Sequence, residues 1–114
     1  MGAFAVRQVI LLPFPFSDLS ASKLRPALLL APADKGDWVL CQITSRPYAD
    51  LQAIALTDTD FSEGGLQRLS YARASKLFTA HESLFQRVAG TLKAKPHMQV
   101  VDMVVHLLRS GVIE

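Results

Sequence analysis

The stretch SKLRPALLLAP at residues 22–32 places two basic residues and a proline directly before an apolar run. Pro26 lacks a backbone N–H and disfavours helical geometry at the residue before it, so the stretch is predicted to be extended. Proline is tolerated at the first residue of a strand, which predicts a strand at 26–32. Arg25 is then expected where a polar loop enters the core, with its guanidinium facing solvent or a cleft.

The segment WVLCQITS at 38–45 is predicted to be the returning strand, after a hairpin turn at KGD (35–37). In an antiparallel hairpin, the start of one strand lies beside the end of the other. Arg25 and Thr44 are therefore expected to be neighbours. A guanidinium can grip phosphate oxygens in a bidentate way, and a nearby hydroxyl can orient a nucleophile or a phosphate oxygen. The pair is a candidate phosphodiester site.

Two structural interpretations stay open at this point. Most arginines are exposed, so Arg25 could be a rim residue paired with a carboxylate. Thr44 and Ser45 could be ordinary residues at the end of a strand.

The rest of the chain favours short strands followed by one helix. Polar residues recur with helical spacing over 96–110, where Pro96 suits the first turn and Gly111 suits the stop. Five or six short strands with a terminal helix predict a mainly β fold, a small barrel that removes its sheet edges by closing. The remaining strands are predicted at 8–14, 53–57, 69–74 and 87–92.

The helix predicted at 96–110 has a narrow polar stripe. One apolar face is expected to pack on the sheet and another to need a partner, which predicts a homodimer. Its apolar residues are Val100, Val101, Met103, Val104, Val105, Leu107 and Leu108.

Length and composition fit one domain spanning 1–114, with half of its residues hydrophobic. The single cysteine, Cys41, excludes an internal disulfide and suits a reducing cytoplasm; its apolar neighbours favour a buried structural role. No apolar run is long enough to span a bilayer, and no signal peptide is recognised. A net charge of +2 permits a nucleic-acid partner without requiring one.

Several kinds of site lack support. No glycine-rich phosphate loop is present, and one cysteine with three dispersed histidines makes no zinc site, so no metal site is predicted. His97 and His106 are expected to be solvated on the helix, and His81 lies in a turn-like segment.

Four segments in this order resemble the MazF/PemK-like toxins of bacterial toxin–antitoxin systems: LLPFPFSDLSASKLRPALLL, VLCQITS, DFSEGGL and SYARASKLFT. The similarity runs from about residue 8 to residue 92. It implies an SH3-like barrel, a homodimer, and a metal-independent endoribonuclease without a cofactor that cuts single-stranded RNA at short sequences. It also implies a protein antitoxin whose C-terminal segment occupies the RNA groove.

The resemblance implies a role for individual residues. Arg25 matches the catalytic arginine of the family and Thr44 its catalytic threonine, with Ser45 beside it. The 14–24 segment matches the loop over the RNA groove, and Arg73 matches an arginine that some members use at the active site. The residues expected to contact RNA are Phe16, Ser17, Asp18, Ser20, Lys23, Arg46, Arg73, Ser75 and Lys76.

The chain departs from the family pattern in two places. Members usually begin the first strand with Gly-Asp, where this chain has Arg7 and Gln8. Many carry an aspartate where this chain has Ser75, which cannot serve as a carboxylate base near neutral pH. A general base would have to come from elsewhere, with Asp18 and His81 as candidates.

The mechanism expected from the resemblance is attack of the RNA 2′-hydroxyl on the adjacent phosphorus. Arg25 would stabilise the charged phosphorane, and Thr44 would hold a non-bridging oxygen or the attacking hydroxyl. Phe14 and Phe16 could stack on bases or belong to the core. Two alternatives remain: a non-catalytic toxin of the same barrel that binds DNA gyrase, and a degenerate toxin that only binds its antitoxin.

Overall fold

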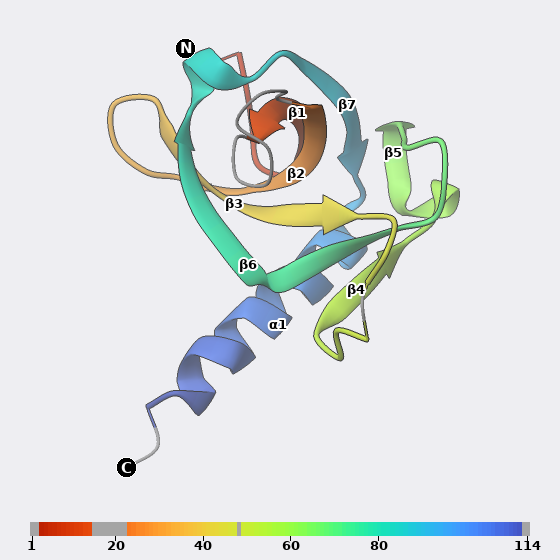
Figure 1. The fold of residues 1–114 in the computed structure, drawn as a ribbon, viewed down its shortest axis with the longest axis vertical. Coiled ribbons are helices and arrows are strands. Elements are labelled where there is room, and N and C mark those ends of the chain that lie inside the picture. The colour runs from red at the N-terminus through yellow and green to blue at the C-terminus, as the bar shows by residue number, and fades with distance from the viewer. Residues whose placement is uncertain (1–2, 15–22, 48, 113–114) are drawn as a thin grey trace.

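The computed structural model describes residues 3–14, 23–47 and 49–112. Seven antiparallel strands form one curled sheet, a half-barrel, in the order β4-β6-β3-β2-β1-β7-β5, and a C-terminal helix follows them (Figure 1). The mainly β fold with a terminal helix is thereby confirmed. The elements are β1 (Gln8–Phe14), β2 (Lys23–Pro32), β3 (Asp37–Thr44), β4 (Ala53–Leu56), η1 (Asp58–Asp60), β5 (Phe61–Gly64), β6 (Ser70–His81), η2 (Glu82–Leu84), β7 (Arg87–Leu92) and α1 (Ala94–Ser110).

The sheet differs from the predicted closed barrel at its two ends. β4 and β5 are the end strands of the observed order, so the described part of the sheet has open edges. β5 is absent from the predicted strands, because it is only four residues long and ends in a glycine. β6 continues beyond the predicted 69–74 as far as His81.

β6 bends where its pairing with β3 changes register. Cys41 pairs with Leu77, whereas the next β3 residue, Gln42, pairs with Arg73. The β6 residues between these two positions form a bulge, which bends the strand and lets it follow the curl of the sheet (Figure 1).

β2 begins earlier than the sequence predicted. It starts at Lys23, so both Arg25 and Pro26 lie inside the strand. The sequence instead predicts Arg25 before the strand and Pro26 at its first residue. Pro26 pairs with Leu11 of β1, but the pairing of β2 with β3 begins only at Ala27. The first part of β2 thus has a partner on one side alone, which is where a strand tolerates proline.

Two apolar clusters lie on opposite faces of the sheet, because neighbouring residues of a strand point to opposite sides. In the first cluster, Leu28 of β2 pairs with Val9 of β1 on one side and with Cys41 of β3 on the other. Val100 of α1 belongs to the same cluster. The second cluster lies on the other face of the sheet. It contains Ile10, Leu12, Phe14, Ala27, Leu29, Trp38, Leu40 and Phe85.

α1 is two residues longer at its start than predicted, with Pro96 in its first turn and Gly111 as its C-cap. Its many valines give it modest intrinsic helix propensity, so its stability depends on packing. Val100 is fully buried in the first cluster, and the helix lies against β6 and β4. No helix in the described part of the chain has the length and apolar character needed to cross a bilayer.

His97 is buried, which contradicts the expectation of a solvated side chain. Only 8 % of its surface is exposed, and its Nδ1 has no hydrogen-bond partner among the described residues. Burial lowers the pKa of His97, and the nearby positive charge of Arg7 lowers it further. His106, by contrast, is exposed on the helix as predicted.

We expect His97 to make the stability of the fold depend on pH. The unfolded chain binds a proton at His97 near the ordinary pKa of about 6.5, whereas the folded chain binds it only at lower pH. The free energy of unfolding should therefore fall as the pH drops below about 6.5, by at most ~1.4 kcal/mol per pH unit for this proton. Urea unfolding of the wild type and His97→Gln at several pH values measures the difference. His106→Gln is the control and should keep the wild-type profile.

Candidate functional site

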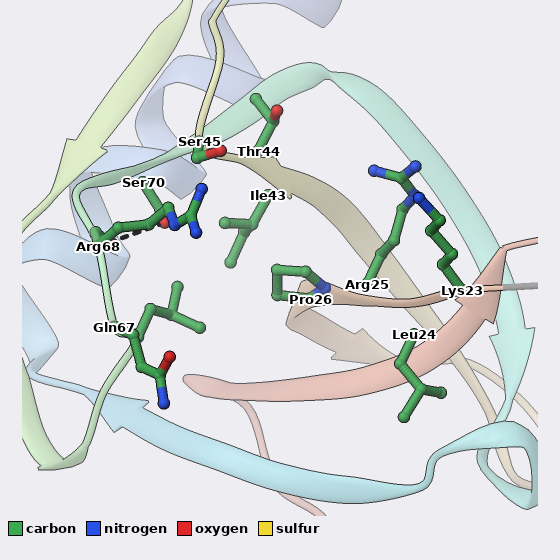
Figure 2. A pocket seen from close by; sticks show the side chains of 11 residues that line it. Lys23, Leu24, Arg25, Pro26, Ile43, Thr44, Ser45, Gln67, Arg68 and Ser70 are labelled. Carbon is green, nitrogen blue, oxygen red and sulfur yellow. Dashed lines mark hydrogen bonds between the residues drawn. The ribbon is translucent and has the colours of Figure 1, made fainter.

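A hollow opens where β2 and β3 separate. The pairing of β2 with β3 ends at Ala27 and Gln42: the β2 residues before Ala27 pair with β1 alone, and the β3 residues after Gln42 pair with β6 alone. The hollow between them has a volume of about 480 Å³. We name it the Arg25 hollow. It is lined by Lys23, Leu24, Arg25, Pro26, Ile43, Thr44, Ser45, Leu66, Gln67, Arg68 and Ser70 (Figure 2).

The structure brings the predicted pair together. Counting two residues outward from the pair Ala27–Gln42 reaches Arg25 on β2 and Thr44 on β3, and both line the Arg25 hollow. Ser45 lies beside Thr44 on the same wall (Figure 2). Arg25 is exposed and has no carboxylate within ion-pair distance among the described residues. The structural interpretation of Arg25 as one half of a rim ion pair is therefore not supported within that part of the chain.

The hydroxyl of Thr44 is held by its own strand end. Its Oγ1 accepts a hydrogen bond from the backbone N–H of Arg46 at 3.1 Å and lies 3.2 Å from the Arg46 carbonyl oxygen, to which it donates. The N–H fixes the hydroxyl oxygen at the wall of the hollow. The hydroxyl proton can turn to a ligand, because a Ser or Thr O–H rotates freely about its bond.

The Arg25 hollow is cationic. Lys23, Arg25 and Arg68 are among its lining residues, and no aspartate or glutamate is. Arg25 and Arg68 approach from opposite sides with Thr44 between them, above a floor that includes Pro26 (Figure 2). Such an arrangement attracts an anion, and guanidinium groups suit phosphate in particular.

Sequence reasoning missed the wall formed by Leu66, Gln67, Arg68 and Ser70. Leu66, Gln67 and Arg68 belong to the segment between β5 and β6, Ser70 is the first residue of β6, and all four reach the site only through the fold. The basic residue at position 68 was the one available signal, and nothing in the sequence indicates which surface it faces.

A second hollow of about 410 Å³ lies along the same face of the sheet. Its lining residue Gln42 lies two positions from Thr44 on β3, and its lining residue Phe14 pairs directly with Lys23. We name it the Phe14 hollow. It is lined by Phe14, Gln42, Arg73, Lys76, Leu77 and Phe78.

The structure places Arg73 in this second hollow and not with Arg25. Its Nε donates to Oδ2 of Asp50 at 2.9 Å, and both side chains are largely buried. The Arg73 guanidinium, followed by the backbone N–H of Gln52, lowers the pKa of Asp50. Phe14 is buried and packs edge-on against Phe78 at 5.1 Å between ring centroids, which favours the core interpretation for this aromatic residue.

The other predicted RNA contacts are distributed as follows. Lys23 lines the Arg25 hollow and Lys76 the Phe14 hollow. Ser75 lies in the β6 bulge and Arg46 beyond the end of β3; both are exposed, and neither lines either hollow. Phe16, Ser17, Asp18 and Ser20 lie outside the described residues.

His81 is placed away from the site. It pairs with Asp37 at the opposite end of β3 from Thr44, seven residues or about 23 Å of strand away. It cannot serve as the general base there. Cys41 is fully buried, and burial raises its pKa to about 12, which agrees with a structural role. No three metal-ligating side chains gather among the residues that the structure describes.

Comparison with solved structures identifies the fold. A MazE–MazF complex from Deinococcus radiodurans matches with a TM-score of 0.76 at 20% identity, covering 99% of this chain and 100% of that one. The Mycobacterium tuberculosis toxin MazF-mt6 matches at 0.70 and 16%, covering 90% and 97%. A mycobacterial endoribonuclease in complex with its cognate antitoxin matches at 0.71 and 14%, covering 96% of each chain.

No protein-family model matches the sequence, and no curated protein matches it. The likeness therefore rests on the arrangement of the strands and the helix, and at these identities it concerns the fold. Across nearly its whole length, the chain has the fold of the MazF toxins.

Proposed function

We propose that this chain is the toxin of a toxin–antitoxin system and acts as a metal-independent endoribonuclease on single-stranded RNA. The observation that carries the proposal is the placement of Arg25 and Thr44 on facing walls of one cationic hollow. The fold supports it, because solved neighbours with this fold are named as toxins and endoribonucleases. Such an enzyme would act in the cytoplasm, where its substrate is made.

The reaction proposed is transesterification. The 2′-oxygen attacks the adjacent phosphorus while the bond from phosphorus to the 5′-oxygen breaks, leaving a 2′,3′-cyclic phosphate and a 5′-hydroxyl. A base accepts the proton of the 2′-hydroxyl, and the departing 5′-oxygen accepts a proton to become the 5′-hydroxyl. Arg25 would stabilise the negative charge that develops on the non-bridging oxygens, because a guanidinium can donate two parallel hydrogen bonds to them.

Thr44 would position the reacting phosphate. Its oxygen is already fixed by the Arg46 N–H, so its proton can turn from the Arg46 carbonyl to a phosphate oxygen with little reorganisation. Ser45, exposed next to it, offers a second hydroxyl at the same wall. The described part of the Arg25 hollow contributes no carboxylate or histidine base.

We further propose that the chain forms a homodimer and binds an antitoxin. Solved neighbours with this fold include complexes of MazE with MazF. Apolar residues remain uncovered on α1 and just beyond its end, namely Met98, Val105, Leu108 and Val112. Leu108 is 59% exposed in the last turns of the helix, where a second copy could bury it.

Arg25→Gln and Thr44→Val should each lower cleavage of a long unstructured RNA on the order of 100-fold, because each removes one group that stabilises the transition state. Mapping of new 5′ ends in the presence of EDTA measures this and reveals the cut sequence. Arg87→Gln and Thr79→Val, exposed positions outside both hollows, are matched controls and should cut like the wild type. Equal activity of all five proteins would refute the assignment.

Replacing the 2′-hydroxyl by hydrogen at the mapped cut site should abolish cleavage there, because the proposed nucleophile is then absent. The neighbouring nucleotides stay as ribonucleotides, so binding is preserved. Gel analysis of the substituted oligonucleotide gives the answer. Continued cutting at that position would require water as the nucleophile and exclude this mechanism.

Leu108→Glu should shift the protein from dimer to monomer, since the change puts a charge into the apolar surface that the dimer would bury. Sedimentation velocity at micromolar concentration measures the shift. Gln99→Glu, which adds the same charge at an exposed polar position of α1, should remain dimeric. A wild-type protein that sediments as a monomer would contradict the dimer.

A further inference from the structure

Arg68 borders the Arg25 hollow on the side opposite Arg25. It belongs to the segment between β5 and β6, and its side chain extends into the hollow toward Ile43 (Figure 2). Thr44 lies between the two arginines in this view. A ligand in the hollow therefore meets a guanidinium from each side.

The backbone around Arg68 is anchored at both ends. After it, the buried hydroxyl of Ser70 donates to the Arg68 carbonyl oxygen at 3.0 Å (Figure 2). Before it, the N–H of Gly65 donates to the carbonyl oxygen of Ala89 on β7 at 3.1 Å. A fixed backbone reduces the entropy lost when the side chain binds a ligand.

Glycine is required where this segment leaves β5. Gly64 has a φ of +62°, and a Cβ there would lie 2.3 Å from the carbonyl oxygen of Ala89. The close approach of β5 to β7 thus depends on the absence of a side chain, and it determines where the segment carrying Arg68 begins.

Arg68 is available for a ligand. No carboxylate lies within ion-pair distance of its guanidinium among the described residues. Asp58 lines a smaller adjoining hollow of about 230 Å³ together with Arg68, but the two side chains form no ion pair. The guanidinium therefore stands without a neutralising partner at the wall of a cavity that has no acidic lining.

We propose that Arg68 forms a second phosphate-binding subsite, which holds a phosphate of the single strand next to the one at Arg25 and Thr44. The inference rests on the proposed function for the identity of the ligand as a nucleic-acid strand. Each nucleotide is flanked by two phosphates, and a hollow of about 480 Å³ falls in the size range of ligand sites. Arg68 is a positioning residue: it contributes to binding and alignment, and Arg25 acts on the reacting phosphate.

The test measures binding separately from cleavage. A short single-stranded DNA of mixed sequence serves as the first probe, because it carries the phosphates but lacks the 2′-hydroxyl. Arg68→Gln should weaken its binding ~10-fold and reduce the slope of log K against log salt by about 0.7, the value for one phosphate contact on a single strand. Arg68→Lys should recover part of the affinity, because the charge returns without the bidentate geometry.

Arg87→Gln is the control, since it removes the same charge from an exposed position on β7 outside both hollows. It should bind like the wild type. On RNA, Arg68→Gln should raise KM ~10-fold with little change in kcat, whereas Arg25→Gln should lower kcat.

The subsite is rejected if Arg68→Gln binds DNA as tightly as the wild type, or if Arg87→Gln loses as much affinity. A wild type that fails to bind DNA rejects it as well, as does a loss of kcat without a change in KM. A wild type that binds DNA but cuts no RNA refutes the endoribonuclease alone, and the comparison of Arg68→Gln with Arg87→Gln still decides the subsite.

Discussion

The separation of β2 from β3 at Ala27 and Gln42 is the constraint on which the site depends. Pro26, the residue before Ala27, has no N–H to donate to a neighbouring strand, and the pairing of β2 with β3 ends at Ala27. Both strands nevertheless continue, each supported on its outer side by β1 or by β6. Rigid strands thus form two walls of a hollow that would not exist if the hairpin paired to its end.

The register of the sheet decides which groups meet at this opening. Arg25 pairs with Leu12, and Thr44 pairs with Tyr71, so the backbone of each is held by a neighbour outside the hollow. A side chain on a paired strand is placed more accurately than one on a free loop, which matters for transition-state stabilisation. The side chains at these ends of β2 and β3 can contact a ligand in the hollow, because the backbones that carry them pair with β1 and β6 outside it.

The sequence predicted features that depend on pairing and hydrophobic pattern, and missed those that depend on tertiary placement. The bounds of β1 and β7 and the neighbourhood of Arg25 and Thr44 follow from local pattern and antiparallel geometry. The continuation of β6 was missed because a bulge interrupts its alternation. The Arg68 wall was missed because it lies on an irregular segment whose position depends on β5 and β7.

The two departures from the family pattern can now be placed, and neither lies at the Arg25 hollow. Arg7 has a φ of 77°, a region that favours glycine, and its carbonyl oxygen accepts from the N–H of Leu92. The glycine usual there would adopt this conformation without the ~1–2 kcal/mol penalty of a residue with a Cβ. Ser75 lies exposed in the β6 bulge. One departure thus strains the backbone at the entry to β1, and the other changes an exposed position outside the Arg25 hollow.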